Sequence, residues 1–124
     1  MHQWPWYPGT GAAADRGPHG SVWNVPMRAG LPPETYVDAF RHAVDAATTG
    51  FVPDLMLISA GFDSLAGDPL GGFTLEIEDF EVLTRFLVER ADAWCGGRIV
   101  SSLEGGYVPQ RLGVACVRHM RALE

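Results

Sequence analysis

Two short loops, each following an apolar run, carry the residues of this sequence that are best suited to chemistry. The first loop, residues 59–72, contains the carboxylates Asp63 and Asp68 among several glycines, and the run before it predicts a fully buried strand. The second loop follows another β-rich run and ends in Tyr107. Reactive groups of α/β proteins lie at the carboxyl ends of parallel strands. We therefore expect Asp68 and Tyr107 to face one site.

Asp68 is the stronger candidate of the two carboxylates. Glycines on both sides of it let backbone approach a ligand closely, and a carboxylate can bind zinc at about 2.0–2.2 Å. Asp before Pro69 is also common in ordinary turns, because Asp accepts bonds from nearby backbone and Pro fixes the next φ. Both interpretations stay open for Asp68. For Asp63 we favour a structural role, in which it accepts N–H groups of its own loop.

Tyr107 follows two glycines, Gly105 and Gly106, at the end of a predicted strand. A phenol is neutral at pH 7 and can donate a hydrogen bond to an oxyanion that develops during a reaction. The alternative is a Tyr that closes the edge of the sheet and bonds to backbone.

The composition describes one acidic globular domain. The chain has 124 residues, 47% of them hydrophobic and 19% charged, and its formal net charge is −6 without any lysine. This balance argues against binding nucleic acid through phosphates, and no stretch is long enough to span a membrane. Cys95 and Cys116 are isolated, which argues against a zinc ribbon and favours a reducing cytoplasm.

Several active-site motifs are missing from the sequence. None of the four histidines stands in HExxH or another metal-ligand spacing, and we expect His42 and His119 to be exposed or half-buried residues of helices. There is no GxSxG, P-loop or GxGxxG that opens a helix. These absences count against acyl-enzyme hydrolases, kinases and dinucleotide enzymes.

The order of predicted elements is strand, helix, strand, helix, strand, helix. Such alternation favours an α/β domain with a parallel sheet. Residues 1–20, rich in Gly, Pro and aromatics, form a loop that either covers a sheet edge or lines a pocket. The predicted strands are 21–26, 54–60 and 98–103; the predicted helices begin near residues 33–34, 74 (with Thr74 as N-cap) and 109.

Four segments, in this order, resemble landmarks of the histone deacetylase family and its bacterial relatives, the acetylpolyamine amidohydrolases and acetoin-utilisation proteins. Residues 58–72 resemble the family's zinc-binding loop, and residues 103–107 resemble its transition-state tyrosine motif. Residues 7–11 and 24–26 resemble two further landmarks. The resemblance covers nearly the whole chain, residues 1–124.

The resemblance implies a fold and a reaction. The fold would be a three-layer α/β/α sandwich with a mostly parallel sheet, as in arginases, and the reaction would be hydrolysis of an N-acetyl amide by a zinc-bound water. Asp68 would be a zinc ligand, and Tyr107 would donate to the oxyanion. The resemblance also implies a substrate pocket with Tyr7 on one wall and Leu75 on another, shaped beside the tyrosine by Gly105 and Gly106.

The sequence departs from the family in one respect. The family's other two zinc ligands form an Asp-x-His motif, and a His-His pair supplies the general base; neither motif occurs here. We therefore expect an incomplete C-terminal portion of the domain, which cannot retain zinc and is inactive alone, because a catalytic zinc needs three protein ligands. A truncated sheet would also expose an apolar edge that invites self-association.

Substrate and metal stay open. The resemblance allows acetyl-lysine in a protein, an acetylpolyamine or a small acetylated metabolite, and either zinc or iron. The alternative function is a non-catalytic α/β remnant or a binding module.

Overall fold

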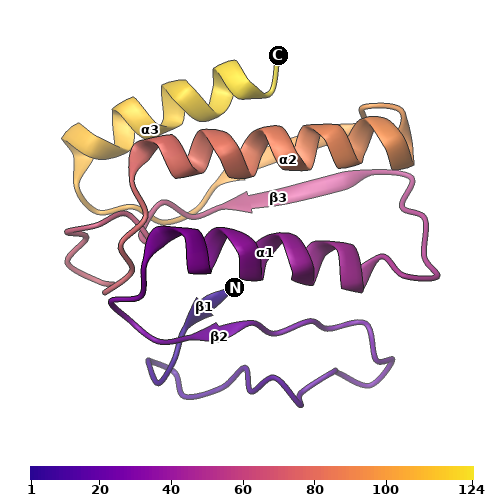
Figure 1. The fold of residues 1–124 in the computed structure, drawn as a ribbon, viewed down its shortest axis with the longest axis horizontal. Coiled ribbons are helices and arrows are strands. Elements are labelled where there is room, and N and C mark those ends of the chain that lie inside the picture. The colour runs from indigo at the N-terminus through magenta and orange to yellow at the C-terminus, as the bar shows by residue number, and fades with distance from the viewer.

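The computed structural model describes residues 1–124, which form two small parallel sheets and three helices (Figure 1). Strands β1 and β2 pair with each other, as do β3 and β4. The two predicted strand–helix units at the C-terminal end are thus present. In chain order the elements are β1 (His2–Gln3), β2 (Pro26–Met27), α1 (Pro33–Ala47), β3 (Met56–Ala60), α2 (Ile77–Cys95), β4 (Ile99–Leu103) and α3 (Pro109–Ala122).

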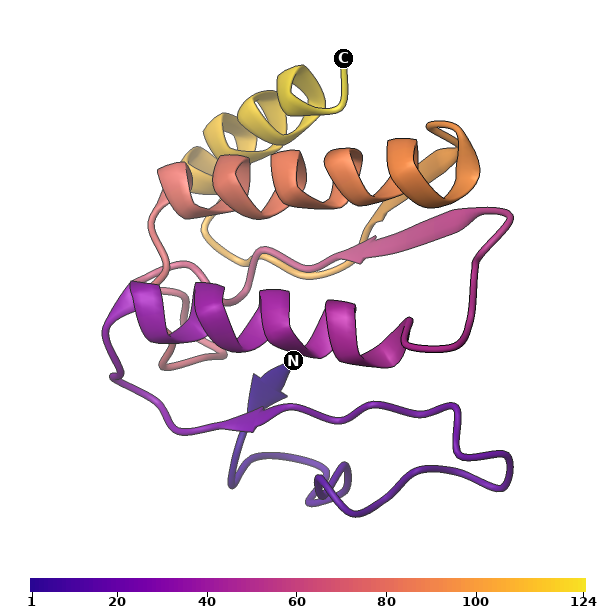
Figure 2. The ribbon, with the colours of Figure 1, turned by 45° about the vertical axis from the view of Figure 1, so that its right-hand side comes forward.

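Strands β3 and β4 are parallel neighbours, as the sequence predicts. Their register pairs Met56 with Ile99 and Ala60 with Leu103, so both strands end at the same edge of the sheet. Helices α2 and α3 lie on one side of β3 and α1 lies on the other in both ribbon views (Figures 1 and 2). This arrangement brings the loops that follow β3 and β4 together.

The face of β3 and β4 turned away from α3 is open. Ser101 of β4 contacts His119 of α3, so the alternate residues point the other way. On that side Leu57 and Val100 are 71% and 54% exposed. The prediction of a fully buried strand at β3 is therefore wrong, because the helices leave the side of β3 that carries Leu57 exposed.

Helix α1 begins where the sequence predicts. Pro33 stands in its first turn, where the missing N–H of proline costs nothing. The hydroxyl of Tyr36 donates to the carbonyl of Arg28 at 2.7 Å and accepts the N–H of Leu31 at 2.9 Å. This fully buried tyrosine fixes the turn that leads into the helix.

Helix α2 begins later than predicted. Its N-cap is Glu76, whose N–H donates to the carboxylate of Asp79 at 2.8 Å. Thr74 is not the cap, because its hydroxyl donates to the carbonyl of Leu31 at 2.6 Å and ties the loop to the start of α1. Gly96, with φ +61°, ends the helix in the left-handed conformation.

The predicted first strand, residues 21–26, is mostly absent. Only Pro26 and Met27 form a strand, β2, because its partner β1 is itself two residues long. The pairing nevertheless joins the N-terminus to the segment that enters α1.

The main hydrophobic core lies beneath the loop that follows β3. Two aromatic stacks anchor it: Tyr36 on Phe73, with ring centroids 4.2 Å apart, and Phe62 on Phe80, at 4.9 Å. The loop thus contributes its own aromatic residues to the core that supports it. The core residues are Tyr36, Val37, Phe62, Leu65, Phe73, Leu75, Phe80 and Ala115.

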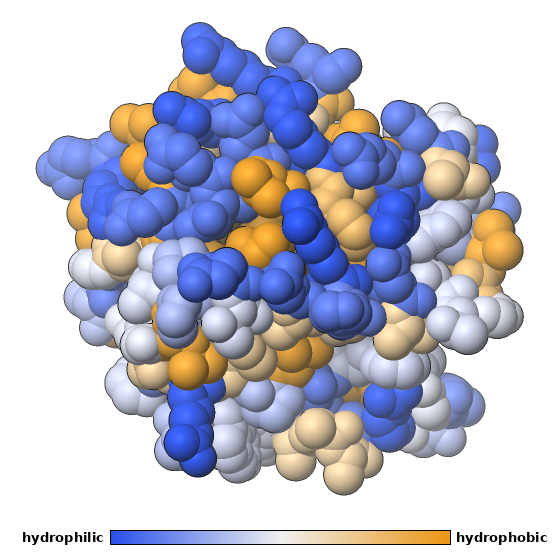
Figure 3. Space-filling model, viewed as in Figure 1, coloured by the Kyte–Doolittle hydropathy of each residue, from blue (hydrophilic) through white to orange (hydrophobic).

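The outer face of the helices is largely hydrophilic, with scattered apolar residues between the charged ones (Figure 3). None of the three helices combines the length and the apolar character that crossing a membrane requires.

Candidate functional site

The loops after β3 and β4 run side by side and are joined by backbone and side-chain bonds. The N–H of Glu104 donates to the carbonyl of Ala60 at 3.1 Å, and the N–H of Phe62 donates to the carbonyl of Gly105 at 2.9 Å. These bonds extend the parallel pairing beyond the strands. The two predicted motif loops therefore form one structural unit.

Asp68 lies at the centre of this unit and is 6% exposed. Its Oδ1 accepts the N–H of Leu70 at 2.9 Å, the bond of an Asp turn. Its Oδ2 accepts the N–H of Tyr107 at 2.8 Å, across 39 residues of sequence. The carboxylate thus makes the local turn and also ties the two loops together.

Gly105 and Gly106 are required by close approach. A Cβ on Gly105 would lie 2.8 Å from Oδ2 of Asp63, and a Cβ on Gly106 would lie 2.8 Å from Leu112 and 3.0 Å from Phe62. Gly106 also has φ +125°, which L side chains rarely adopt. The two glycines let the tyrosine loop lie directly on the aspartate loop.

Asp63 lies between the loops with its carboxylate against Gly105, although the residue as a whole is exposed. Loss of water around the carboxylate raises the pKa of Asp63, and the nearby charge of Asp68 raises it further. A bond to its own backbone N–H acts in the opposite direction. The structural role that the sequence suggests for Asp63 stays a prediction.

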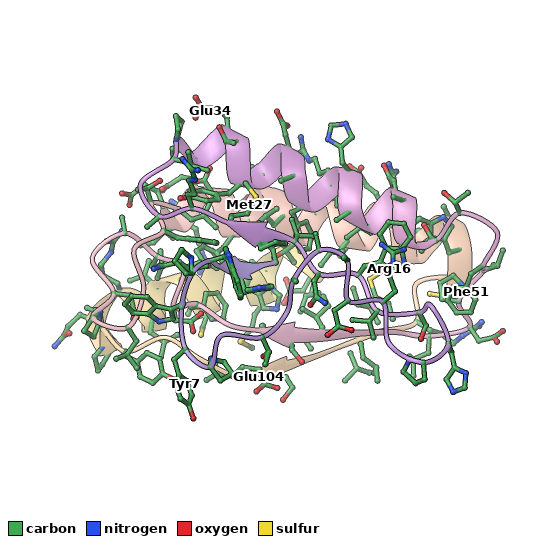
Figure 4. The ribbon with its side chains drawn as sticks, turned by 90° about the horizontal axis from the view of Figure 1, so that it is seen from below. Tyr7, Arg16, Met27, Glu34, Phe51 and Glu104 are labelled. Carbon is green, nitrogen blue, oxygen red and sulfur yellow. The ribbon has the colours of Figure 1, made fainter.

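The tyrosine side chains are more exposed than the loops that carry them. Tyr107 is 52% exposed, and Tyr7 is 92% exposed and points outward from the N-terminal segment (Figure 4). A cavity of about 590 Å³ lies between the N-terminal segment and the helices, with Tyr7, Asp63 and Leu75 among its lining residues. Leu75 is also 1% exposed and belongs to the core. Asp68 and Tyr107 do not line this cavity.

Gln3 and Arg111 hold the aspartate loop but were missed from the sequence. The side-chain oxygen of Gln3 accepts the N–H of Gly72 at 2.6 Å, and Arg111 donates to the carbonyl of Ala66. No local spacing in the sequence points to contacts across such distances. The sequence signals only their positions, because Gln3 precedes the aromatic N-terminal motif and Arg111 follows Tyr107.

His119 is buried, contrary to the expectation of an exposed or half-buried residue. Its Nδ1 lies 2.7 Å from the hydroxyl of Thr84, and its Nε2 lies 2.8 Å from that of Ser101. The Thr84 hydroxyl donates to the carbonyl of Phe80, so it accepts from Nδ1–H and leaves Nε2 to accept from Ser101. Burial lowers the pKa of His119 and favours this neutral form.

The residues of this chain do not make a complete metal site. A catalytic zinc takes three protein ligands, and no three His, Cys, Asp or Glu side chains of residues 1–124 are grouped to hold an ion. Asp68 is a single carboxylate whose two oxygens already accept backbone N–H groups.

Comparison with known proteins matches the histone deacetylase domain to residues 1–123. The chain belongs to the histone deacetylase family. The chain is 40% identical to an uncharacterized protein of Synechocystis over 123 residues, covering 99% of this chain and 39% of that protein. It is also 40% identical to histone deacetylase 15 of Arabidopsis thaliana over 105 residues, covering 82% of this chain and 18% of that protein.

Solved structures of deacetylase domains share the fold. The HDA15 HD domain superposes with a TM-score of 0.83 at 35% identity, over 96% of this chain and 34% of that one. The histone deacetylase Clr3 superposes with a TM-score of 0.82 at 31% identity, over 95% and 20%. The fold is thus the deacetylase α/β fold, here incomplete. This histone deacetylase family chain spans less than two fifths of the length of these relatives.

Proposed function

We propose that this chain supplies the C-terminal part of the active site of a zinc-dependent deacetylase that hydrolyses N-acetyl amides. The observation that carries the proposal is the bond from the Tyr107 N–H to Asp68, because it joins the two motif loops at the ends of adjacent parallel strands. In the complete domain, Asp68 would be a metal ligand and the Tyr107 hydroxyl would donate to the oxyanion of the tetrahedral intermediate.

The substrate would be an acetylated amine, either acetyl-lysine in a protein or an acetylpolyamine. The net charge of −6 favours the approach of a cationic substrate. Tyr7 and Leu75 would form walls of the acyl pocket, with Gly105 and Gly106 shaping it beside Tyr107. The two free cysteines fit the reducing cytoplasm that we propose as the compartment.

Alone, the chain should not hydrolyse acetyl amides. One carboxylate cannot hold a catalytic zinc, and without a bound metal and a general base, water is not activated. The test is to add zinc and an acetyl-lysine peptide to the chain and to measure acetate. No release above the metal blank is expected. Release that Asp68→Ala abolishes would contradict the proposal of an inactive part.

A chimera tests the positive half of the proposal. Residues 1–123 would replace the matching segment of the HDA15 HD domain, and the rest of that domain would have to provide the remaining ligands and the base. We expect zinc-dependent deacetylation that Asp68→Ala abolishes, with the unmodified HDA15 HD domain as the activity control. A folded chimera that binds zinc but is unaffected by Asp68→Ala would overturn the assignment.

Self-association is a second proposal, which the open face of β3 and β4 supports. Leu57 and Val100 are 71% and 54% exposed there. Burying such side chains is worth about 25 cal/mol per Å² of apolar area. We expect a dimer or larger species in sedimentation at micromolar concentration, and Leu57→Ser with Val100→Ser should shift it to monomer. A parent chain that sediments as monomer would refute this.

A further inference from the structure

We propose that Arg111 is a positioning residue that holds the aspartate loop at a fixed place against the tyrosine loop. Arg111 stands in the first turn of α3, four residues after Tyr107. Its guanidinium reaches back to the neighbouring loop, which contains Asp68. The effect of Arg111 on catalysis rests on the proposed function, whereas its contacts are present in the structure whatever that function is.

The guanidinium of Arg111 bonds to the chain on both sides of Asp68. Nη1 of Arg111 donates to the carbonyl of Ala66, two residues before Asp68. Nη2 donates to a carboxylate oxygen of Glu76, the N-cap of α2. Glu76 follows Asp68 by eight positions, so the segment between the two contacts is the part of the loop that bears the proposed ligand.

Backbone bonds beside these contacts already join the two strands of chain at the base of the loop, which we call its neck. The N–H of Ala66 donates to the carbonyl of Leu75 at 2.8 Å, and the N–H of Leu75 donates to the carbonyl of Ser64 at 3.2 Å. Arg111 adds the connection that the neck lacks, which is one to the element that follows Tyr107. Together with the Tyr107 N–H to Asp68 bond, it holds the part of the loop around Asp68, beyond the backbone bonds that join the two loops nearer the strands.

The planar fork of arginine suits this task better than a point charge. Two N–H groups that diverge from one rigid plane can fix a carbonyl and a carboxylate at once. Arg111 is 33% exposed and Glu76 is 54% exposed, so the ion pair by itself adds little to stability. Its value is the geometry that it imposes on the loop.

Arg118 provides a matched control on the same helix. It also joins α3 to glutamates of α2, with Nη2 3.2 Å from Glu78 and Nη1 3.2 Å from Glu81. It makes no hydrogen bond or ion pair with either motif loop. Arg111→Met and Arg118→Met therefore remove similar ion pairs, and only the first removes a tie to the loop.

The test is amide hydrogen exchange of the full chain, read by NMR. In Arg111→Met we expect exchange of the Tyr107 and Leu70 amides, which both donate to Asp68, to accelerate about tenfold or more. The Tyr107 amide proton should also shift upfield as its bond weakens. Amides in the centre of α2 should keep their rates. Arg118→Met should leave both loop amides unchanged, and Arg111→Lys should restore them only in part.

Two results would overturn the proposal. One is a Tyr107 amide whose exchange and shift are the same in Arg111→Met as in the parent chain. The other is acceleration spread equally over the loops and α2 in both variants, which is a general loss of stability. Neither readout involves metal or substrate, so this proposal can fail while the chimera is active, and it can hold while the chimera is inactive.

Discussion

The end of the β3–β4 sheet and the N-terminal segment differ in how many of their side chains find hydrogen-bonding or packing partners within this chain. At the sheet end, Asp68 is 6% exposed and both of its oxygens accept backbone N–H groups. In the N-terminal segment, Trp6 and Tyr7 are 53% and 92% exposed, and β1 has two residues. Motif residues are therefore held in place where this chain supplies their partners, and they stay in solvent where it does not.

Glycine substitutions should show the largest difference in stability loss between the two regions. We expect Gly106→Ala to lower the free energy of unfolding by about 2–4 kcal/mol, because a Cβ there meets Leu112 and Phe62 at φ +125°. Gly9→Ala, at φ +81° with nothing within 4 Å, should cost about 1 kcal/mol. Urea unfolding of both variants measures the difference. Equal losses would contradict the contrast between the two regions.

His119→Gln should come next, with a loss of about 1–3 kcal/mol from the broken bonds to Thr84 and Ser101. The free energy of unfolding should also depend on pH in a definite direction. The folded state disfavours the charged imidazole, so the unfolded chain binds more protons and stability falls as pH drops below about 6.5.

Urea unfolding from pH 7 to pH 5 checks this sign. His119→Gln should flatten the fall in stability, whereas His42→Gln, at an exposed position, should leave it as in the parent. A His119→Gln profile as steep as that of the parent would show that the buried network is not its source.

Asp63→Asn should have a smaller and opposite effect. The pKa of Asp63 is raised in the folded state, so its ionisation opposes folding and its cost appears as pH rises above about 3.8. The substitution should stabilise the chain at pH 7 by less than about 1 kcal/mol, because the residue is exposed. The gain should vanish near pH 3. Thermal unfolding at the two pH values measures it, and a loss of stability at pH 7 would mean that the carboxylate makes a needed bond.

Tyr7→Ala should change stability least, by no more than about 0.5 kcal/mol, because the side chain is almost fully exposed. Chemical unfolding checks this. A larger loss would show that the N-terminal segment is packed in solution and would weaken the contrast with the sheet end.

Much of the sheet end could be predicted from the sequence. The apolar runs before the two loops and the proline at the start of α1 are local signals, and β3, β4 and α1 lie where these signals place them. The family was visible in four motifs in order. The adjacency of the Asp68 and Tyr107 loops follows from parallel strands ending at one edge.

The predictions that are wrong share a physical cause, because each of these features depends on contacts between residues distant in sequence. Thr74 resembles a helix cap but bonds to Leu31, 43 residues away. The burial of His119 depends on β4 and α2, which its own helical pattern does not reveal. The partial alternation of apolar and polar residues in a β-rich run predicts a strand at 21–26, whereas the length of the strand is set by its partner β1.

The central claim is that the two loops form one half of a deacetylase site, and kcat of Tyr107→Phe in the HDA15 chimera tests it most directly. The substitution removes the hydroxyl and keeps the backbone N–H that bonds to Asp68. We predict that kcat falls about 10²–10³-fold while KM changes little, as for loss of an oxyanion donor. A kcat equal to that of the unsubstituted chimera, in a folded and zinc-loaded protein, would contradict the account.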